Sequence, residues 1–144
     1  MSGSPGQLTV GARERTVLTE RAMAAMERAY APYSGFRVGA ALLAGDGSVT
    51  EGCNVENAAY PAGICAERAA VAAAVTRGVR DFAVIVIATE ADRPTPPCGM
   101  CRQVLMEFAP QLEVVSRTRS GASARWTMSE LLPEAFTPTS LGRR

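Results

Sequence analysis

Apolar residues between positions 13 and 30 recur every three or four residues, which is the spacing of one helix face. These positions are Leu18, Ala22, Ala25, Met26 and Ala29. Pro32 follows them and cannot continue a helix. The pattern therefore predicts a helix over residues 13–30.

Two short apolar segments come next, separated by Gly45-Asp46-Gly47. Residues 36–43 are mostly small and branched apolar side chains, and residues 48–54 form the second segment. A Gly-Asp-Gly sequence is typical of a tight turn. We therefore expect two neighbouring antiparallel strands.

The middle of the chain alternates between helix and strand patterns. Residues 66–77 are rich in alanine and predict a helix that ends at Gly78. Residues 82–89 form a continuous apolar run, as in a strand buried on both faces. Residues 100–108 place their apolar side chains on one side and predict a further helix, which Pro110 ends.

Weaker patterns complete the chain. Residues 112–115 and 124–127 are predicted strands, and residues 129–132 predict a short helix. Two antiparallel strands followed by strand–helix alternation favour a mixed sheet with helices on both faces, which is an α/β fold.

The length of 144 residues is that of one domain, and no repeat or long linker divides the chain. We predict a flexible N-terminal tail over residues 1–11, a single domain over residues 12–137 and a C-terminal tail over residues 138–144. The tail at the N-terminus is rich in Ser, Gly and Pro and lacks the features of a secretory signal.

Composition excludes several classes of protein. The net charge is +1 without a basic run, which argues against a nucleic-acid partner. No stretch approaches the ~18 apolar residues of a membrane helix. Four cysteines in a chain of this kind indicate thiols and not disulfides. We therefore expect a cytoplasmic protein without nucleic-acid or membrane partners.

Three cysteines carry the candidate chemistry. Cys98 and Cys101 form a C-x-x-C pair, and Cys65 precedes them by 33 residues. Three thiolates leave the fourth tetrahedral position of a zinc ion open, as in catalytic sites. A closed structural site with Cys53 as fourth ligand is the alternative, but such sites usually contain two C-x-x-C pairs. We therefore predict one zinc ion held by Cys65, Cys98 and Cys101.

Glu67 follows Cys65 by two residues. Glu67 is too close to Cys65 in the sequence to be a favourable fourth zinc ligand, but its side chain can face the open coordination position of the zinc ion. A surface carboxylate in the first helical turn is the alternative interpretation. Both cysteine segments begin predicted helices, where the positive end of the helix dipole favours thiolates.

The order Cys-x-Glu followed by Pro-Cys-x-x-Cys resembles the signature of zinc deaminases, in which Cys can replace His. The chain also resembles the small homotetrameric cytidine deaminases from Leu18 to Phe136. The resemblance rests on five segments in the same order, namely residues 31–41, 52–60, 64–68, 97–105 and 131–136. The chain departs from that family at Pro61-Ala62-Gly63-Ile64, where the family usually reads Gly-x-Thr/Ser-x.

This resemblance implies a three-layer α/β/α sandwich around a five-stranded mixed sheet. It implies zinc-dependent hydrolysis of cytidine and 2′-deoxycytidine to uridine and 2′-deoxyuridine plus ammonia. Glu67 would be the catalytic acid and base, and Arg68 would donate hydrogen bonds to the ligand sulfurs. A homotetramer with active sites shared between subunits is also implied.

The resemblance further implies the residues that bind substrate. Asn54 and Glu56 lie two apart at a strand end, so their side chains share a face. They would hold the ribose 3′-hydroxyl, while an Asx-type turn is the alternative for this segment.

Aromatic residues and one backbone group complete the implied substrate site. Phe36, Tyr60 and Phe136 would contribute aromatic rings to the pocket, although a core position is the alternative for Phe36. The backbone N–H of Ala66 would contact the base edge.

Three other functions remain open at this point. A deaminase of the blasticidin S type shares the zinc motif, and the loop Pro61–Gly63 keeps that substrate open. A polynucleotide-editing deaminase is disfavoured by the low charge and small size. A zinc-stapled interaction module without enzymatic activity is the third, and it has no use for Glu67.

Overall fold

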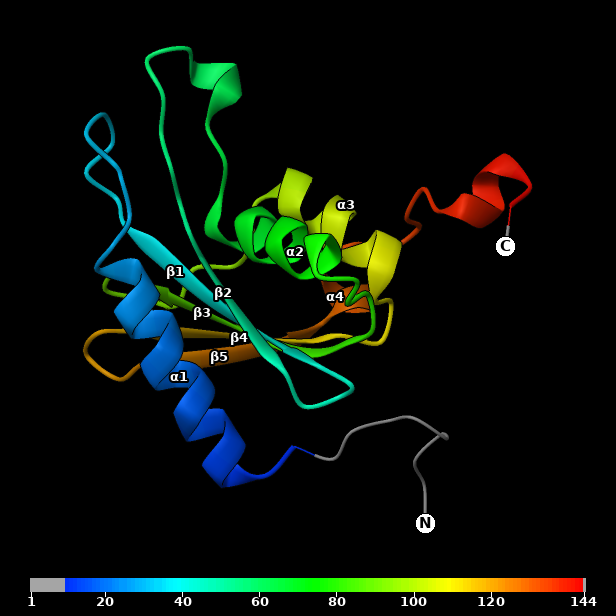
Figure 1. Cartoon of the computed structure of the whole chain (residues 1–144), viewed down its shortest axis with the longest axis horizontal. Helices are drawn as coiled ribbons and strands as arrows, with labels where there is room; N and C mark the ends of the chain where they lie inside the picture. Colours follow the sequence, from blue (N-terminus) through cyan, green and yellow to red (C-terminus); the bar gives the residue numbers. More distant parts are fainter. Residues whose placement is uncertain (1–9, 144) are drawn as a thin grey trace.

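The computed structural model describes residues 10–143 and contains one five-stranded sheet in the order β2-β1-β3-β4-β5 (Figure 1). β3 pairs with β4 in parallel, and the other neighbours are antiparallel. The strands are β1 (Val38–Ala44), β2 (Val49–Cys53), β3 (Phe82–Thr89), β4 (Glu113–Thr118) and β5 (Ser123–Thr127).

Helices cover both faces of this sheet (Figure 1). The helix α1 (Ala12–Met26) packs on one face, and three helices pack on the other. These three are α2 (Ala66–Thr76), α3 (Gly99–Phe108) and α4 (Met128–Leu131). Two short 3₁₀ helices lie outside the layers, η1 (Tyr60–Ala62) and η2 (Pro138–Leu141). The predicted mixed five-stranded α/β/α fold is confirmed.

The continuous apolar run of β3 follows from its central position. Ile85 and Ile87 point to the face covered by α2 and α3, and Val84 and Val86 point to the face covered by α1. Each face therefore needs apolar side chains, because neither is exposed to water. The strand predicted over residues 82–89 is confirmed in full.

Two glycines allow the helices to approach the sheet closely. A Cβ atom on Gly39 would lie 2.0 Å from the backbone oxygen of Ala22 in α1. On Gly52 it would lie 2.4 Å from the backbone oxygen of Ala66, in the first turn of α2. Gly52 thus sets the depth at which the start of α2 sits on the sheet.

Several predicted boundaries need correction. The helix predicted over residues 13–30 ends at Met26, because the chain then turns and Tyr30 bridges to Val55. The strand predicted over residues 112–115 extends to Thr118. The short helix predicted over residues 129–132 is the single turn α4, which begins earlier.

The two predicted tails lie at the ends of the described residues. Most of the N-terminal tail predicted over residues 1–11 lies outside the described residues. The segment 138–144 contains η2, and Figure 1 shows the chain after α4 extending away from the sheet and its helices.

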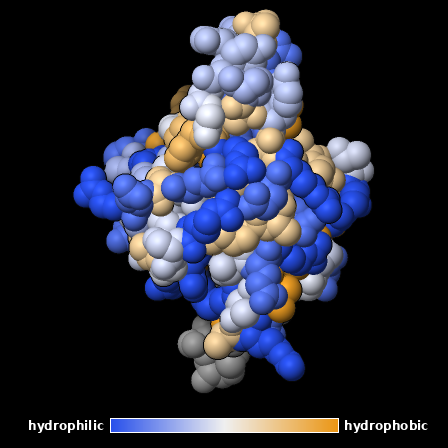
Figure 2. Space-filling view, turned by 90° about the vertical axis from the view of Figure 1, so that its left-hand side faces the viewer, coloured by the Kyte–Doolittle hydropathy of each residue, from blue (hydrophilic) through white to orange (hydrophobic). Residues whose placement is uncertain are grey.

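The remaining features concern the hydropathy of the surface and the apolar character of the helices. The face seen in Figure 2 is mostly hydrophilic, with apolar residues interspersed. Among residues 10–143, none of the helices combines the length and apolar character that a membrane crossing requires.

Candidate metal centre and substrate pocket

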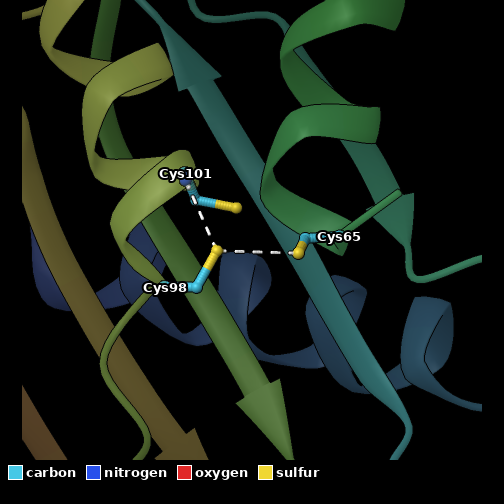
Figure 3. A group of neighbouring side chains, drawn as sticks. All are labelled: Cys65, Cys98 and Cys101. Atoms are coloured by element: carbon cyan, nitrogen blue, oxygen red, sulfur yellow. Dashed lines mark hydrogen bonds between the residues drawn. The ribbon is translucent and has the colours of Figure 1, made fainter. Parts of the chain in front are cut away.

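The first turns of α2 and α3 bring the three predicted cysteines together (Figure 3). Cys65 is the N-cap of α2, Cys98 is the N-cap of α3, and Cys101 lies in the first turn of α3. Their sulfur atoms all lie within 4.8 Å of one another. The cluster therefore forms where two helix N-termini meet, and their dipoles favour thiolate over thiol.

The donor set fits a zinc ion. A tetrahedral site with Zn–S bonds of about 2.3 Å places two sulfurs about 3.8 Å apart. The sulfurs of Cys65 and Cys98 are 3.8 Å apart, far beyond a disulfide bond. Within residues 10–143, no further Cys, His, Asp or Glu belongs to the group, so Cys53 lies outside it. The arrangement is that of an open site and not of a closed four-cysteine site.

The protonation of the cluster is set by its own members and by Arg68. The pKa of the Cys65 thiol is lowered to about 5, chiefly by a hydrogen bond from the Cys101 thiol. A guanidinium nitrogen of Arg68 lies 3.5 Å from Cys65 Sγ and adds to this shift. The pKa of the Cys101 thiol is raised, chiefly by the same hydrogen bond with Cys65 and also by burial. The surroundings of Cys65 therefore favour the thiolate, which is the form that binds a metal ion.

Glu67 lies beside the cluster with only 5% of its surface exposed. Burial raises the pKa of its carboxyl group to about 7, and the negative charge of Cys65 adds to the rise. A carboxyl group with such a pKa can both give and take a proton near neutral pH. The alternative of a surface carboxylate is wrong, because the side chain is buried.

A cavity of about 440 Å³ opens over the cluster, within the size range of small-molecule sites. Six of the residues predicted to contact substrate line it, namely Phe36, Asn54, Glu56, Tyr60, Ala66 and Glu67. Cys65, Cys98 and Arg68 also contribute to its wall. The cavity therefore joins the candidate metal site to the residues predicted to bind substrate.

Asn54 and Glu56 are both fixed by hydrogen bonds. The Asn54 amide donates to the Phe36 carbonyl at 2.8 Å and accepts from the Val38 N–H at 2.8 Å. It thus joins the end of β2 to the segment before β1. The alternative of an Asx-type turn is wrong, because these partners lie 16 and 18 positions away.

The Glu56 carboxylate accepts three hydrogen bonds from the segment before β1. The N–H groups of Tyr33 and Ser34 donate to Oε1 at 2.9 and 3.1 Å, and the Ser34 hydroxyl donates to Oε2. The Ser34 hydroxyl is the main reason that the pKa of Glu56 is lowered. The carboxylate is therefore held ionised, and one acceptor position on Oε2 remains for a ligand.

The three predicted aromatic residues differ in their placement. Phe36 lines the cavity and is 38% exposed. Tyr60 stands in η1, 75% exposed, with its ring 6.0 Å from that of Tyr33 in an edge-on contact. Phe136 is 59% exposed and lies outside the cavity, although its carbonyl accepts a hydrogen bond from Gln103. The structure does not bring Phe136 to the pocket of its own chain.

The unusual loop Pro61–Gly63 has a defined base. Backbone hydrogen bonds join Val55 and Ile64 in both directions, at 3.0 and 2.9 Å. Pro61 lies within η1, where its fixed φ is tolerated at the start of a helix. The loop is therefore closed at its base by these two hydrogen bonds, and it lies beside the cavity.

The cavity is also lined by residues that the sequence motifs do not single out as site residues, among them Ser34, Thr89, Thr95 and Pro96. The prolines of the segment Arg93–Pro97 favour an extended loop and carry no further signal in the sequence. The position of this segment in the cavity wall depends on contacts with β3 and β4. Such long-range contacts cannot be predicted from a local sequence pattern.

A mixed α/β/α domain with three cysteine sulfurs at helix N-termini and a buried glutamate beside them has the features of a zinc deaminase. The model of the family described as "Cytidine and deoxycytidylate deaminase zinc-binding region" matches residues 12–116. The chain belongs to this family.

Individual relatives cover most of the chain. A cytidine deaminase of Halalkalibacterium halodurans is 48% identical over 125 residues, which span 86% of this chain and 95% of the relative. A crystal structure of cytidine deaminase from Burkholderia pseudomallei matches with a TM-score of 0.82 and 49% identity, over 84% of this chain and 98% of that chain. A blasticidin-S deaminase of Bacillus cereus is 32% identical over 69% of this chain and 76% of its own length.

Proposed function

We propose that this protein is a cytidine deaminase, which hydrolyses cytidine and 2′-deoxycytidine to uridine and 2′-deoxyuridine plus ammonia. The observation that carries the proposal is the buried Glu67, which lines a cavity of about 440 Å³ beside three clustered thiols. The similarity to cytidine deaminases over most of the chain supports the same reaction.

Cys65, Cys98 and Cys101 would hold one Zn²⁺ ion beside the cavity, whose wall includes Cys65 and Cys98. Zinc, when bound, supplies a Lewis acid that makes water a nucleophile at neutral pH. The Arg68 guanidinium offsets the negative charge of the three sulfurs, since it lies 3.5 Å from Cys65 Sγ. Without that offset, three thiolates would leave a net negative centre.

Glu67 performs the proton transfers. It takes a proton from the attacking water and delivers it to N3 of the cytosine ring, which makes C4 electrophilic. It then moves the hydroxyl proton to the departing amino group, so that ammonia leaves. A pKa of about 7 suits a group that must accept and donate in one cycle.

The remaining cavity residues orient the nucleoside. Asn54 and Glu56 hold the ribose 3′-hydroxyl, since each keeps hydrogen-bonding capacity after its contacts within the chain. The Phe36 ring packs on the pyrimidine, and the backbone N–H of Ala66 contacts the base edge. Tyr60 contributes to the rim near the sugar.

The active form would be a homotetramer in which Phe136 enters a neighbouring subunit's pocket. Its ring is 59% exposed and outside the cavity of its own chain, and the segment after α4 extends away from the domain. A three-thiolate site requires reduced cysteines, which supports the cytoplasm as the compartment.

Blasticidin S is the second candidate substrate. The similarity to a blasticidin-S deaminase and the loop Pro61–Gly63 beside the cavity favour testing it. That relative is less similar to the chain than the cytidine deaminases, at 32% against 48% identity.

A substrate panel tests the proposal. The zinc-loaded protein is incubated with cytidine, 2′-deoxycytidine, cytosine, blasticidin S and a single-stranded oligonucleotide, and absorbance loss and ammonia release are followed. We expect rapid turnover of the two nucleosides and slow or undetectable turnover of the others. Turnover of blasticidin S alone would identify the second candidate, and no turnover at all would favour an interaction module.

A further inference from the structure

A proline-rich segment forms part of the cavity wall. Thr95 and Pro96 line the cavity, and Cys98 follows two residues later. Prolines have no backbone N–H, so Thr95 carries the sole backbone donor of the sequence Pro94-Thr95-Pro96-Pro97. The position of this wall therefore depends strongly on what that donor binds.

The donor binds a side chain from the central sheet. Thr95 N donates to Ser116 Oγ at 3.0 Å, across 21 positions of the chain. Ser116 lies in β4 beside Ile87 of β3, which lines the same cavity. At the other end of the segment, Arg102 Nε of α3 donates to the Pro97 carbonyl at 2.8 Å. The wall is thus fastened to the sheet on one side and to a helix on the other.

The hydroxyl group of Ser116 is a polar group in apolar surroundings. Ser116 is 0% exposed and follows the buried residues Val114 and Val115. Burying a hydroxyl in such surroundings is unfavourable unless it forms a hydrogen bond. The bond to Thr95 N offsets this cost, which links the presence of a serine here to the cavity wall.

We propose that Ser116 is a positioning residue that holds the Thr95–Pro96 wall in the place where it contacts the nucleoside. The proposal rests on the proposed nucleoside deaminase function. Without the hydrogen bond between Thr95 and Ser116, the wall occupies that place for only a fraction of the time. The apparent affinity for the nucleoside is then reduced by that fraction. A bound nucleoside selects the correct wall position, so turnover of the bound complex changes little.

The Ser116→Ala variant tests this mechanism. Loss of one hydrogen bond predicts a rise of about two- to tenfold in KM for cytidine, with kcat within about twofold of wild type. The Kd of uridine, measured by titration calorimetry, rises by the same factor without any turnover. The Ser116→Thr variant keeps the hydroxyl and restores KM and Kd toward wild type.

Thr50→Val is the matched control. Thr50 also carries a buried hydroxyl with one side-chain partner, since Arg77 donates to it at 2.6 Å, but it lies in β2 and does not line the cavity. Its removal lowers Tm as Ser116→Ala does, yet leaves KM and Kd unchanged. If Ser116→Ala likewise lowers Tm and leaves KM and Kd unchanged, the positioning role is refuted.

Amide hydrogen exchange reports on the hydrogen bond between Thr95 and Ser116 independently of enzymatic activity. Exchange over residues 94–97 reports the Thr95 N–H alone, because the other three are prolines. Exchange should be slow in the wild type and in Thr50→Val, and faster by about two- to tenfold in Ser116→Ala. Equal exchange in the wild type and Ser116→Ala would overturn the proposal. A wild type that neither deaminates cytidine nor binds uridine refutes the proposed function, and with it the role toward the nucleoside, whatever the exchange shows.

Discussion

At the scale of single residues, three glutamates show how surroundings set protonation. Burial raises the pKa of Glu67 to about 7, whereas the Arg37 guanidinium lowers the pKa of the exposed Glu90 to about 2. Glu56 has its pKa lowered by the Ser34 hydroxyl and by backbone N–H groups. One residue type thus provides a proposed proton carrier, an ion-pair partner and a fixed hydrogen-bond acceptor.

The cysteines make the first prediction at this scale. Cys65→Ser, Cys98→Ser and Cys101→Ser should each lose bound zinc, because each removes one of the three clustered sulfurs. Cys53→Ser should retain zinc, because Cys53 ends β2 outside the cluster. Metal analysis of the four purified variants checks this. Equal zinc loss in all four would indicate a closed structural site.

The sugar contacts make the second prediction. Asn54→Ala and Glu56→Ala should lower kcat/KM for cytidine about ten- to hundredfold, since an unpaired buried polar partner costs about 1–3 kcal/mol. Their slow activity on free cytosine should hardly change, because cytosine has no ribose. Parallel losses on both substrates would place these residues in folding, where Asn54 also joins β2 to the segment before β1.

At the scale of elements, the site depends on two helix starts that a central sheet holds in place. The cysteine spacing and the helix patterns predict this arrangement from sequence, and β3 is predicted in full because its two covered faces require an apolar run. The helix boundary at Met26 is not predictable from the local pattern, because helical spacing continues to Ala29. The Tyr30–Val55 bridge, a contact distant in sequence, overrides it.

The cavity wall shows the same limit. Ser116 and Thr95 are 21 positions apart, and neither lies in a pattern that reports the other. The chemical residues of the site are therefore predictable from motifs, while the residues that place its wall require the folded chain.

The attachment of α1 to the sheet makes a prediction about pH. Arg15 of α1 donates to both carboxylate oxygens of Glu113 in β4 at 2.6 Å, and Arg125 of β5 also donates to this group. The hydrogen bond from Arg15 is the main reason that the pKa of Glu113 is lowered. Because the folded-state pKa lies below the unfolded one, this stabilisation is present above the unfolded value and is lost as pH falls through the folded value.

Glu113→Gln should therefore lower stability by about 1 kcal/mol at neutral pH. Its Tm should also fall less steeply than that of the wild type as the solution is acidified below about pH 4.5, the ordinary glutamate range. Glu51→Gln is the control, because the Arg21–Glu51 pair is more exposed. Identical acid dependence of the wild type and Glu113→Gln, measured by thermal unfolding, would contradict this account.

At the scale of the whole molecule, one predicted site residue lies away from the pocket. Phe136 is outside its own cavity, on a segment that Figure 1 shows extending from the domain. A second copy of the chain would bring this ring to a pocket, as the proposed homotetramer requires. Base–aromatic stacking is worth about 1–3 kcal/mol, so Phe136→Ala should reduce kcat/KM about ten- to hundredfold.

Mixed assemblies test whether Phe136 acts between subunits. Co-expression of Phe136→Ala with Glu67→Ala chains allows an intact Glu67 to meet a neighbour's intact Phe136. The mixture should then be more active than either parent. If Phe136 acts within its own chain, mixing only dilutes the Phe136→Ala activity, and the measured rate per chain falls below that of this parent.

The central claim is that Glu67 carries protons beside a zinc site, and one comparison tests it most directly. Turnover of cytidine and bound zinc are measured on the same samples of wild type, Glu67→Gln and the control Glu107→Gln, which changes an exposed residue of α3. The account predicts that Glu67→Gln keeps its zinc and Tm but loses at least about 10²–10⁴-fold in kcat, because an amide cannot carry the proton. The Glu107→Gln control should remain fully active. Near-full activity of zinc-loaded Glu67→Gln would contradict the account.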